Sequence, residues 1–429
     1  MIAFRSLLAA VAAAMCASVT TVTVPVAVAA SAAQPAAILK LNSVACASSA
    51  YCLAVGQDVT NQRGFAEEWD GGTWRVIPAP DPGTPTALWD VACYMVGRCL
   101  TVGTYFNAGG VGVTLAAQWD GSRWRLLSPA SPGAADLLDG IACSSPARCV
   151  AVGATLASAY QPLAEQWDGR RWRQLPSPDP GRSGALTAVA CPSAAWCMTV
   201  GGVAAADGTT RTLSALWNGK RWRVLPAPAV ARSDFVDVSC DSRDRCVATG
   251  YSYPATAPAS AVSQNGEVPG LRVLTEEWDG AGWRLLPFDS PAAGAAGDLR
   301  LGIGIDLSGA APAKAATVTT AATGADGQLP GVACGLSAGS CLAVGDYIDG
   351  AGRGQTLAGA WDGVSEGGGW RVLQPVYPAG AEAVLTDVAC PSPVQCVAVG
   401  DYDYTTGEMP FADVWNGSQW RLLTMPSGP

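Results

Sequence analysis

The chain contains no histidine. This absence excludes Ser-His-Asp and Cys-His catalysis, together with every zinc, copper or haem site that requires a histidine ligand. Charged residues are also scarce, at 14% of 429, and the 26 basic and 35 acidic side chains give a net charge of −9. Because the basic residues are spread along the sequence, nucleic acid is not expected as a partner.

What the chain has in abundance is apolar residues, at 49%, with 50 glycines, 30 prolines, 15 cysteines and 16 tryptophans. A half-apolar chain can bury a core, which argues against disorder. The length suits two or three ordinary domains or one large repeat domain.

Residues 1–33 are typical of a secretory signal. Arg5 is the only charge before Lys40, an Ala/Val/Leu-rich stretch follows it, and small-x-small cleavage sites lie at Ala27–Ala29 and Ser31–Ala33. We therefore expect residues 34–429 to be secreted and extracellular. An uncleaved membrane anchor is the alternative, since the apolar run is long. No other segment is apolar for long enough to span a bilayer.

Seven copies of one unit follow, and paired cysteines mark each copy. Six pairs have the spacing C-x5-C and one has C-x6-C. The pairs are Cys46/Cys52, Cys93/Cys99, Cys143/Cys149, Cys191/Cys197, Cys240/Cys246, Cys334/Cys341 and Cys390/Cys396. Repetition at a fixed period of this length indicates a repeat architecture.

Paired tryptophans close each unit. The first opens Trp-(Asp/Asn)-Gly and the second precedes arginine, and 14 of the 16 tryptophans belong to this pattern. The pairs are Trp69/Trp74, Trp119/Trp124, Trp167/Trp172, Trp217/Trp222, Trp278/Trp283, Trp361/Trp370 and Trp415/Trp420. We expect these rings to pack between neighbouring units, because a sugar-stacking role would not require them in every copy.

Each unit reads as four short antiparallel strands. Examples are Leu186–Cys191 for the first strand, Cys149–Gly153 for the second and Leu163–Asp168 for the third, and the fourth carries Trp-Arg. Asp-Gly between two such runs is a strong hairpin signal. The sequence therefore predicts an all-β, seven-bladed β-propeller with four antiparallel strands per blade. A linear solenoid is weaker, since no unit has a polar cap.

The fifth unit departs from the period, because Cys240 and Cys334 are 94 positions apart. Two insertions, at about 251–270 and 288–329, account for the excess. Residues 299–307 leave open an eighth, degenerate blade.

The fourteen paired cysteines predict one disulfide in each blade, stapling the hairpin between the first two strands. Their even number, short spacing and the export signal favour structural bridges, each stabilising by roughly 2 kcal/mol. Metal binding is the alternative, but C-x5-C is not a zinc-knuckle spacing. No cofactor and no metal are expected.

A ligand site is expected where loops vary between units. The loops after the second and fourth strands share one face and differ in length and chemistry, and such loops on a rigid scaffold usually carry recognition. The candidate binding residues on them are acidic or aromatic: Asp346, Tyr347, Asp349, Asp401, Tyr402, Asp403, Tyr404, Glu408, Tyr251, Tyr253 and Tyr105.

Carboxylates beside aromatic rings suit a sugar or peptide ligand. Asp401, Asp403 and Glu408 could instead hold calcium, but the glycine is misplaced for an EF-hand loop. A solvated acidic loop is the plainer alternative. Asp90, Asp237 and Asp387 share one position in the first strand, where they could line a central channel or act as turn or ladder residues.

The unit Val-x-Cys-x5-Cys-x-Ala-Val-Gly … Trp-(Asp/Asn)-Gly-x2-Trp-Arg resembles the repeat of secreted propeller-like proteins from high-GC Gram-positive bacteria. The resemblance covers Leu39 to about Leu423. It is distantly similar to Asp-box propellers of the sialidase and photosystem-assembly-factor kind, and to Kelch-like propellers. It implies a fold and a compartment. No motif matches the arginine triad of sialidases, and galactose-oxidase-like propellers need histidine ligands.

The expected function is a secreted binding or scaffolding module for a cell-envelope or extracellular glycan, or for a surface protein, with no identifiable catalytic centre. The alternative is a glycan-cleaving hydrolase or lyase that uses loop carboxylates, with Asp346, Asp401, Asp403 and Glu408 as candidates.

Overall fold

The computed structural model describes residues 38–83, 85–226, 228, 230, 232–253, 267–269, 271–288, 298–300, 327–336, 340–349, 353–363, 369–404 and 407–426. The segment interpreted as a secretory signal lies outside them. Among the described residues, no helix is long and apolar enough to cross a membrane.

Within the unit Ala36–Pro429, the described residues form seven four-stranded antiparallel sheets, and in each of these sheets the strands pair in chain order. Blades 1 to 4 contain β1 (Leu39–Ser48), β2 (Tyr51–Asp58), β3 (Arg63–Trp69) and β4 (Trp74–Val76); β5 (Thr86–Met95), β6 (Arg98–Phe106), β7 (Gly112–Trp119) and β8 (Trp124–Leu127); β9 (Asp136–Ser145), β10 (Arg148–Leu156), β11 (Tyr160–Trp167) and β12 (Trp172–Gln174); β13 (Gly184–Ser193), β14 (Trp196–Ala204), β15 (Thr210–Trp217) and β16 (Trp222–Leu225). Blades 5 to 7 contain β17 (Ser233–Cys240), β18 (Cys246–Ser252), β20 (Arg272–Trp278) and β21 (Trp283–Leu285); β23 (Gly327–Cys334), β24 (Cys341–Ile348), β25 (Gly354–Trp361) and β26 (Trp370–Leu373); β27 (Glu382–Ser392), β28 (Gln395–Tyr404), β29 (Gly407–Trp415) and β30 (Trp420–Leu423).

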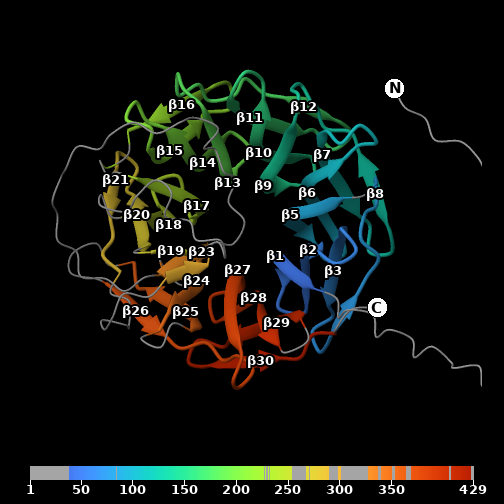
Figure 1. Cartoon of the computed structure of the whole chain (residues 1–429), viewed down its shortest axis with the longest axis vertical. Coiled ribbons are helices and arrows are strands. Elements are labelled where there is room, and N and C mark those ends of the chain that lie inside the picture. The colour runs from blue at the N-terminus through green and yellow to red at the C-terminus, as the bar shows by residue number, and fades with distance from the viewer. Residues whose placement is uncertain are drawn as a thin grey trace, which may run out of the picture. The chain divides into compact units, whose positions relative to one another are not determined.

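The sheets form a closed ring around a central axis (Figure 1). The first strand of each blade contacts the first strands of both neighbouring blades, and β27 contacts β1 across the point where the chain ends meet. Every blade is made from one continuous stretch of chain, so no strand is exchanged at the closure. The seven-bladed propeller is confirmed, and the linear solenoid is excluded.

Side chains of the innermost strands tie successive blades together. From β27, the Thr386 hydroxyl donates to the Leu41 carbonyl at 2.7 Å and the Asp387 carboxylate accepts the Val44 N–H at 2.8 Å. Both residue numbers rise together along the two strands, so β27 and β1 run in the same direction. Because the inner strands of neighbouring blades run parallel, corresponding loops of every blade fall on the same end of the ring.

The three aspartates at one position of the first strand act in this way. Each accepts the N–H of its own following residue and one from a neighbouring blade: Asp90 from Ile141 at 2.6 Å, Asp237 from Val332 at 2.8 Å, and Asp387 from Val44. These half-buried carboxylates therefore bridge blades, a role that the sequence alone did not indicate.

All seven predicted disulfides are present within their own blades, with Cα–Cα distances of 4.0–4.2 Å. In five blades the two cysteines are direct cross-strand partners, as Cys46 and Cys52 are. In blades 4 and 7, Cys191 and Cys390 lie at a local shift in register. Each bridge therefore joins the first two strands beside their connecting loop.

The second cysteine of each bridge is buried deep in its blade. The second cysteines are at most 1% exposed: Cys52, Cys99, Cys149, Cys197, Cys246, Cys341 and Cys396. The reason is that the second strand lies inside each blade, where the preceding blade covers its side chains.

Three of these cysteines show the contact with the preceding blade. Cys99 lies in a buried cluster with Leu53 of blade 1. Cys197 lies in one with Val150 of blade 3, and Cys396 in one with Leu342 of blade 6. The half-cystines at these positions are core residues as well as cross-links, which the sequence interpretation did not predict.

The paired tryptophans lie opposite one another on the third and fourth strands, as Trp119 and Trp124 do with ring centroids 5.3 Å apart. The first ring of each pair packs against the preceding blade. Trp119, for example, lies in a buried cluster with Leu53 and Val55 of blade 1. The expected packing between blades is confirmed, and it makes the repeated rings part of the core.

The two insertions meet in a small additional sheet. β19 (Glu267–Pro269), in the first insertion, pairs antiparallel with β22 (Asp298–Arg300), in the second. This pairing involves two strands and not four, so within the described ranges residues 298–300 belong to a separate two-stranded sheet and not to a four-stranded eighth blade. Residues 301–326 lie outside the described part of the chain.

Candidate functional site

The loops at the two ends of the ring differ in how strongly their length and sequence vary from blade to blade. At one end lie the loops between the cysteines and the Trp-(Asp/Asn)-Gly turns, which we call the hairpin face. Gly71 of one such turn lies against Ala50 of the neighbouring loop, and Gly169 lies against Ala147 in the same way. The other end, with the loops after the second and fourth strands, is the variable face.

One position on the variable face sets the chemistry of each gap between blades. It follows the glycine of the second strand, and it is occupied by Gln57, Thr104, Ala154, Gly202, Tyr251, Asp346 and Asp401. Its side chain points toward the next blade. The Thr104 hydroxyl donates to the Asp136 carbonyl of blade 3 at 3.2 Å, and an added Cβ at Gly202 would lie 2.4 Å from Asp234 of blade 5.

Acidic residues occupy this position in blades 6 and 7. Asp346 is 2% exposed and accepts a hydrogen bond from the Gln328 amide at 3.0 Å. Asp401 is 8% exposed and lies near Lys40 of blade 1, which forms a 2.7 Å ion pair with Glu408. Among the described residues, none donates a hydrogen bond to the Asp401 carboxylate.

Burial has the largest effect on the pKa values of Asp346 and Asp401. Desolvation raises the pKa of Asp346 and that of Asp401 to about 7. At Asp401 the charge of Lys40 opposes the shift, while Glu408, Asp403 and Asp346 add to it. Near neutral pH these two carboxyl groups can therefore each donate or accept a hydrogen bond. The surrounding acids outweigh the desolvation of Lys40 and raise its pKa.

A second, aromatic group lies in blade 5. Tyr251 and Tyr253 meet edge to face with centroids 5.4 Å apart, and the Arg232 guanidinium lies 5.9 Å from the Tyr253 centroid. Both rings pack against Leu271 and against Ile348 of blade 6. Burial raises the pKa of both phenols.

The structure places the other aromatic candidates in different surroundings. Tyr347 packs toward blade 5, and the Tyr402 ring meets Phe411 with centroids 6.1 Å apart. Tyr105 packs between blades 1 and 2, outside the gaps that hold the acidic group. The backbone of Tyr404 pairs at the end of β28. These tyrosines are therefore not brought together in one aromatic platform.

Four of the acidic candidates do come together, and one does not. Asp349 forms a 2.9 Å ion pair with Arg353 within its own loop. The acidic group is formed by Asp346, Asp401, Asp403 and Glu408, with Lys40 and Gln328 beside them. Within the described ranges, no three acidic or cysteine side chains converge in a way that could hold a metal ion.

The sequence interpretation missed Lys40 and Gln328, because both lie in first strands and not in loops. A signal for Lys40 existed, since it is one of three lysines in the chain. Recognising its role requires knowing that blade 1 lies next to blade 7.

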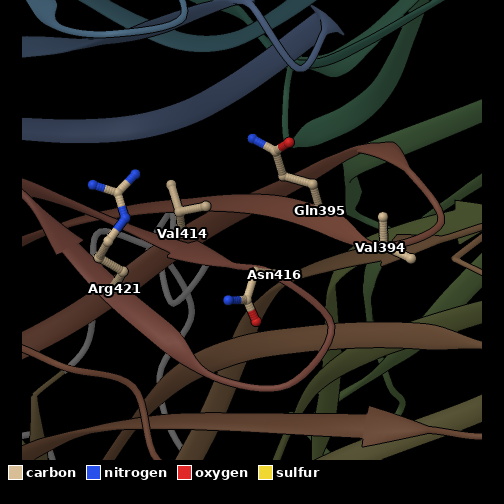
Figure 2. A pocket seen from close by; sticks show the side chains of 5 residues that line it. All are labelled: Val394, Gln395, Val414, Asn416 and Arg421. Atoms are coloured by element: carbon tan, nitrogen blue, oxygen red, sulfur yellow. The ribbon is translucent and has the colours of Figure 1, made fainter.

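A separate hollow lies on the hairpin face of blade 7 (Figure 2). Its volume is about 310 Å³, and its lining consists of Val394, Gln395, Val414, Asn416 and Arg421. The guanidinium of Arg421 makes no hydrogen bond or ion pair with any described residue.

Comparison with blade 1 explains this hollow. At the positions of Gln395 and Val414, blade 1 has Tyr51 and Glu68. Tyr51 is buried, and Glu68 binds Arg75 and accepts the Trp119 Nε1–H at 3.4 Å. The smaller, uncharged residues of blade 7 leave that space open.

Comparison with known proteins gives weak similarities. No family model and no curated protein matches the sequence. Among solved structures, YCF48 bound to D1 peptide has a TM-score of 0.48 at 10% identity, covering 90% of this chain and 95% of that one. YCF48 from Cyanidioschyzon merolae has a TM-score of 0.44 at 12% identity, covering 86% and 94%. A variant of Aleuria aurantia lectin in complex with alpha-methyl-L-fucoside has a TM-score of 0.42 at 10% identity, covering 92% and 98%.

Proposed function

We propose that this protein is a secreted binding module that takes a glycan on the variable face, where blades 6, 7 and 1 meet. The observation that carries the proposal is the Asp401 carboxyl group, which is buried beside Asp346 and receives no hydrogen bond from any described residue. A ligand hydroxyl would supply that hydrogen bond, which is worth more at a carboxyl group so little exposed than at one in open water.

The neighbouring side chains suit a sugar. Asp346 and Asp401 can exchange hydrogen bonds in both directions with hydroxyl groups near neutral pH, because their pKa values lie at about 7. Lys40 and Glu408 add a donor and an acceptor at the rim. Tyr402 packs among residues of blades 6 and 7 and adds aromatic surface.

A glycan array followed by calorimetry tests the proposal. We expect Asp401→Asn to weaken binding of the best glycan at least tenfold, because the amide cannot replace both bonding states of the acid. The control is Asp207→Asn, another loop acid on the variable face, which pairs with Arg211 in blade 4. Unchanged binding in Asp401→Asn, or binding only to surface proteins, would contradict the proposal.

Glycan cleavage is the second candidate function. A buried carboxyl group with a raised pKa, near a second carboxyl group, is what a general acid in glycan cleavage requires. The distinguishing measurement is product release from a polysaccharide panel. Turnover that disappears in both Asp401→Asn and Asp346→Asn would assign catalysis, whereas saturable binding without products supports the binding module.

Secretion is part of the proposal. Seven disulfides indicate an oxidising compartment. Sequencing the N-terminus of protein recovered from the culture medium should show a start close to residue 30 or 34, and retention of Arg5 would instead support the membrane anchor.

A further inference from the structure

The hairpin face of blades 2, 3 and 4 carries a dense group of basic side chains. We call this group the basic arc, and it comprises Arg98, Arg123, Arg125, Arg148, Arg170, Arg171, Arg173, Lys220, Arg221 and Arg223. All ten are exposed. The same loops and turns carry two acidic residues, Asp120 and Asp168. The sequence concealed this excess, because the ten residues are dispersed over more than 120 positions.

The local structure of the turns explains why these side chains point outward. In blade 3, the Asp168 carboxylate accepts the N–H groups of Arg170 and Arg171, both at 2.9 Å, and Gly169 adopts a φ of 89°. Blade 4 repeats the turn with Asn218, which accepts from Lys220 and Arg221 at 3.0 Å. Each capped turn therefore holds two consecutive basic side chains toward solvent.

A second position adds charge to the arc. The residue before the second cysteine is arginine in blades 2 and 3, at Arg98 and Arg148, and its loop lies beside the capped turn. Because blades 2, 3 and 4 are neighbours in the ring (Figure 1), the arc repeats from one blade to the next.

Most of this charge has no internal partner. Arg123 pairs with Asp120 at 3.4 Å, and Arg171 and Arg173 pair with Asp168 at 3.6 and 3.0 Å. Arg125 donates to the Gln118 amide oxygen at 2.6 Å. The other six make no side-chain hydrogen bond or ion pair with any described residue: Arg98, Arg148, Arg170, Lys220, Arg221 and Arg223.

The excess of basic over acidic side chains is specific to blades 2, 3 and 4. The corresponding loop and turn of blade 7 contain Gln395, Asn416, Ser418 and Gln419, with Arg421 as their only basic neighbour. The protein as a whole has a net charge of −9, so a net positive arc requires that acidic residues be concentrated elsewhere. Unpaired like charges repel one another, and an anionic partner would relieve that repulsion.

We propose that the basic arc binds an anionic polysaccharide, on the face opposite the proposed glycan site and independently of it. A polymer whose charges recur along its length matches a surface whose charges recur with each blade. Seven disulfides indicate an oxidising compartment, which favours an extracellular polymer over nucleic acid. The capped turns are short and mainly polar at their tips, which favours a polymer over insertion into a lipid surface.

The test uses the protein recovered after export and two probes, heparin as a sulfated polymer and polygalacturonate as a carboxylated one. Binding of either should fall at least tenfold between about 50 and 200 mM salt, as expected when several charges are neutralised together. In the triple variant Arg148→Ser, Arg170→Ser and Arg221→Ser, affinity at low salt should fall at least tenfold.

The control variant removes the same number of positive charges, but from the variable face. It combines Arg63→Ser, Arg182→Ser and Arg211→Ser, three exposed arginines of the variable face, and its affinity should stay within twofold of the parent. Thermal unfolding of both variants should be unchanged, which separates binding from folding. Equal loss in the two variants, no binding of either polymer, or tighter binding to duplex DNA or to vesicles containing phosphatidylglycerol would overturn the proposal. The neutral-glycan result for Asp401→Asn does not bear on these outcomes.

Discussion

Blades 3 and 7 differ from blades 1 and 5 in whether one buried carboxyl group accepts a hydrogen bond. The group stands two residues before the first tryptophan of the pair, and all four side chains are fully buried: Glu67, Glu165, Glu276 and Asp413. In blade 3, Glu165 accepts the Ala130 N–H at 3.0 Å, and in blade 7, Asp413 accepts the Val376 N–H at 2.7 Å. Both oxygens of Glu67 and of Glu276 lack a partner among the described residues.

The reason lies in the segment that crosses from the preceding blade. Ala130 and Val376 each stand six positions after the second tryptophan of that blade. The residue at this spacing before blade 1 is Pro426, across the ring closure, and before blade 5 it is Pro228. Proline has no N–H to donate. Burial raises the pKa to about 8 for the two unpartnered glutamates and to about 7 for the two partnered acids, where the hydrogen bond offsets part of the effect.

The largest expected effect of this difference is on the pH dependence of stability. Glu67 and Glu276 have folded-state pKa values near 8, above the ordinary value of 4.5 in the unfolded chain. The folded state therefore holds protons that the unfolded state releases, and this stability is fully present below pH 4.5 and is lost as pH rises through 8. The unfolding free energy of the parent protein should therefore fall between about pH 5 and pH 9. In the double variant Glu67→Gln and Glu276→Gln, this fall should be smaller by roughly 3 kcal/mol or more.

Urea denaturation across that pH range measures the effect. The matched control is Glu68→Gln, which changes the adjacent glutamate that already pairs with Arg75. A parent protein that is equally stable at both ends of the range would show that the two glutamates are not buried as protonated acids.

A smaller effect distinguishes partnered from unpartnered acids at one pH. Asp413→Val leaves the Val376 N–H without its acceptor, which should cost about 2 kcal/mol. Glu67→Leu removes a carboxyl group that no described residue bonds, so it should be neutral or stabilising. The measurement is the unfolding free energy at pH 7, and equal destabilisation by the two changes would contradict the distinction.

The fold could be predicted because its signals are local and repeated. Cys46 and Cys52 are six residues apart, and the Asp-Gly turn after Trp69 specifies a hairpin without reference to the rest of the chain. The depth at which a bridge lies could not be predicted in the same way, since the burial of Cys99 depends on the neighbouring blade that covers it.

The site was predicted less completely than the fold. Asp401 and Lys40 are separated by 361 positions and meet only because the ring closes between blades 7 and 1. The position after the second-strand glycine can be read from every repeat, but the partner of its side chain depends on which blade stands next to it.

The basic arc was missed for a related reason. Residues such as Arg98 and Lys220 stand far apart in the sequence. An even distribution of charge along the chain becomes an uneven one in space because corresponding loops and turns of every blade fall on the same end of the ring. Charge counted along a repeat protein must therefore be sorted by strand order before it indicates a partner.

The smallest expected effect on stability comes from Lys40, which lies beside the Asp401 carboxyl group at the rim of the proposed glycan site. Lys40 supplies the positive charge that lowers the pKa of Asp401, and it also pairs with Glu408 at 2.7 Å. Lys40→Met should destabilise the protein by less than about 1 kcal/mol, because the pair is partly exposed. It should nevertheless raise the pKa of Asp401 above 7, since it converts a carboxyl group with a nearby cation into one surrounded by acids.

A carbon-13 NMR titration of the aspartate carboxyl groups measures this shift. Arg353→Met, which removes the partner of Asp349, controls for a general loss of positive charge. An unchanged Asp401 titration in Lys40→Met would mean that burial alone sets its protonation, and would remove Lys40 from the proposed site.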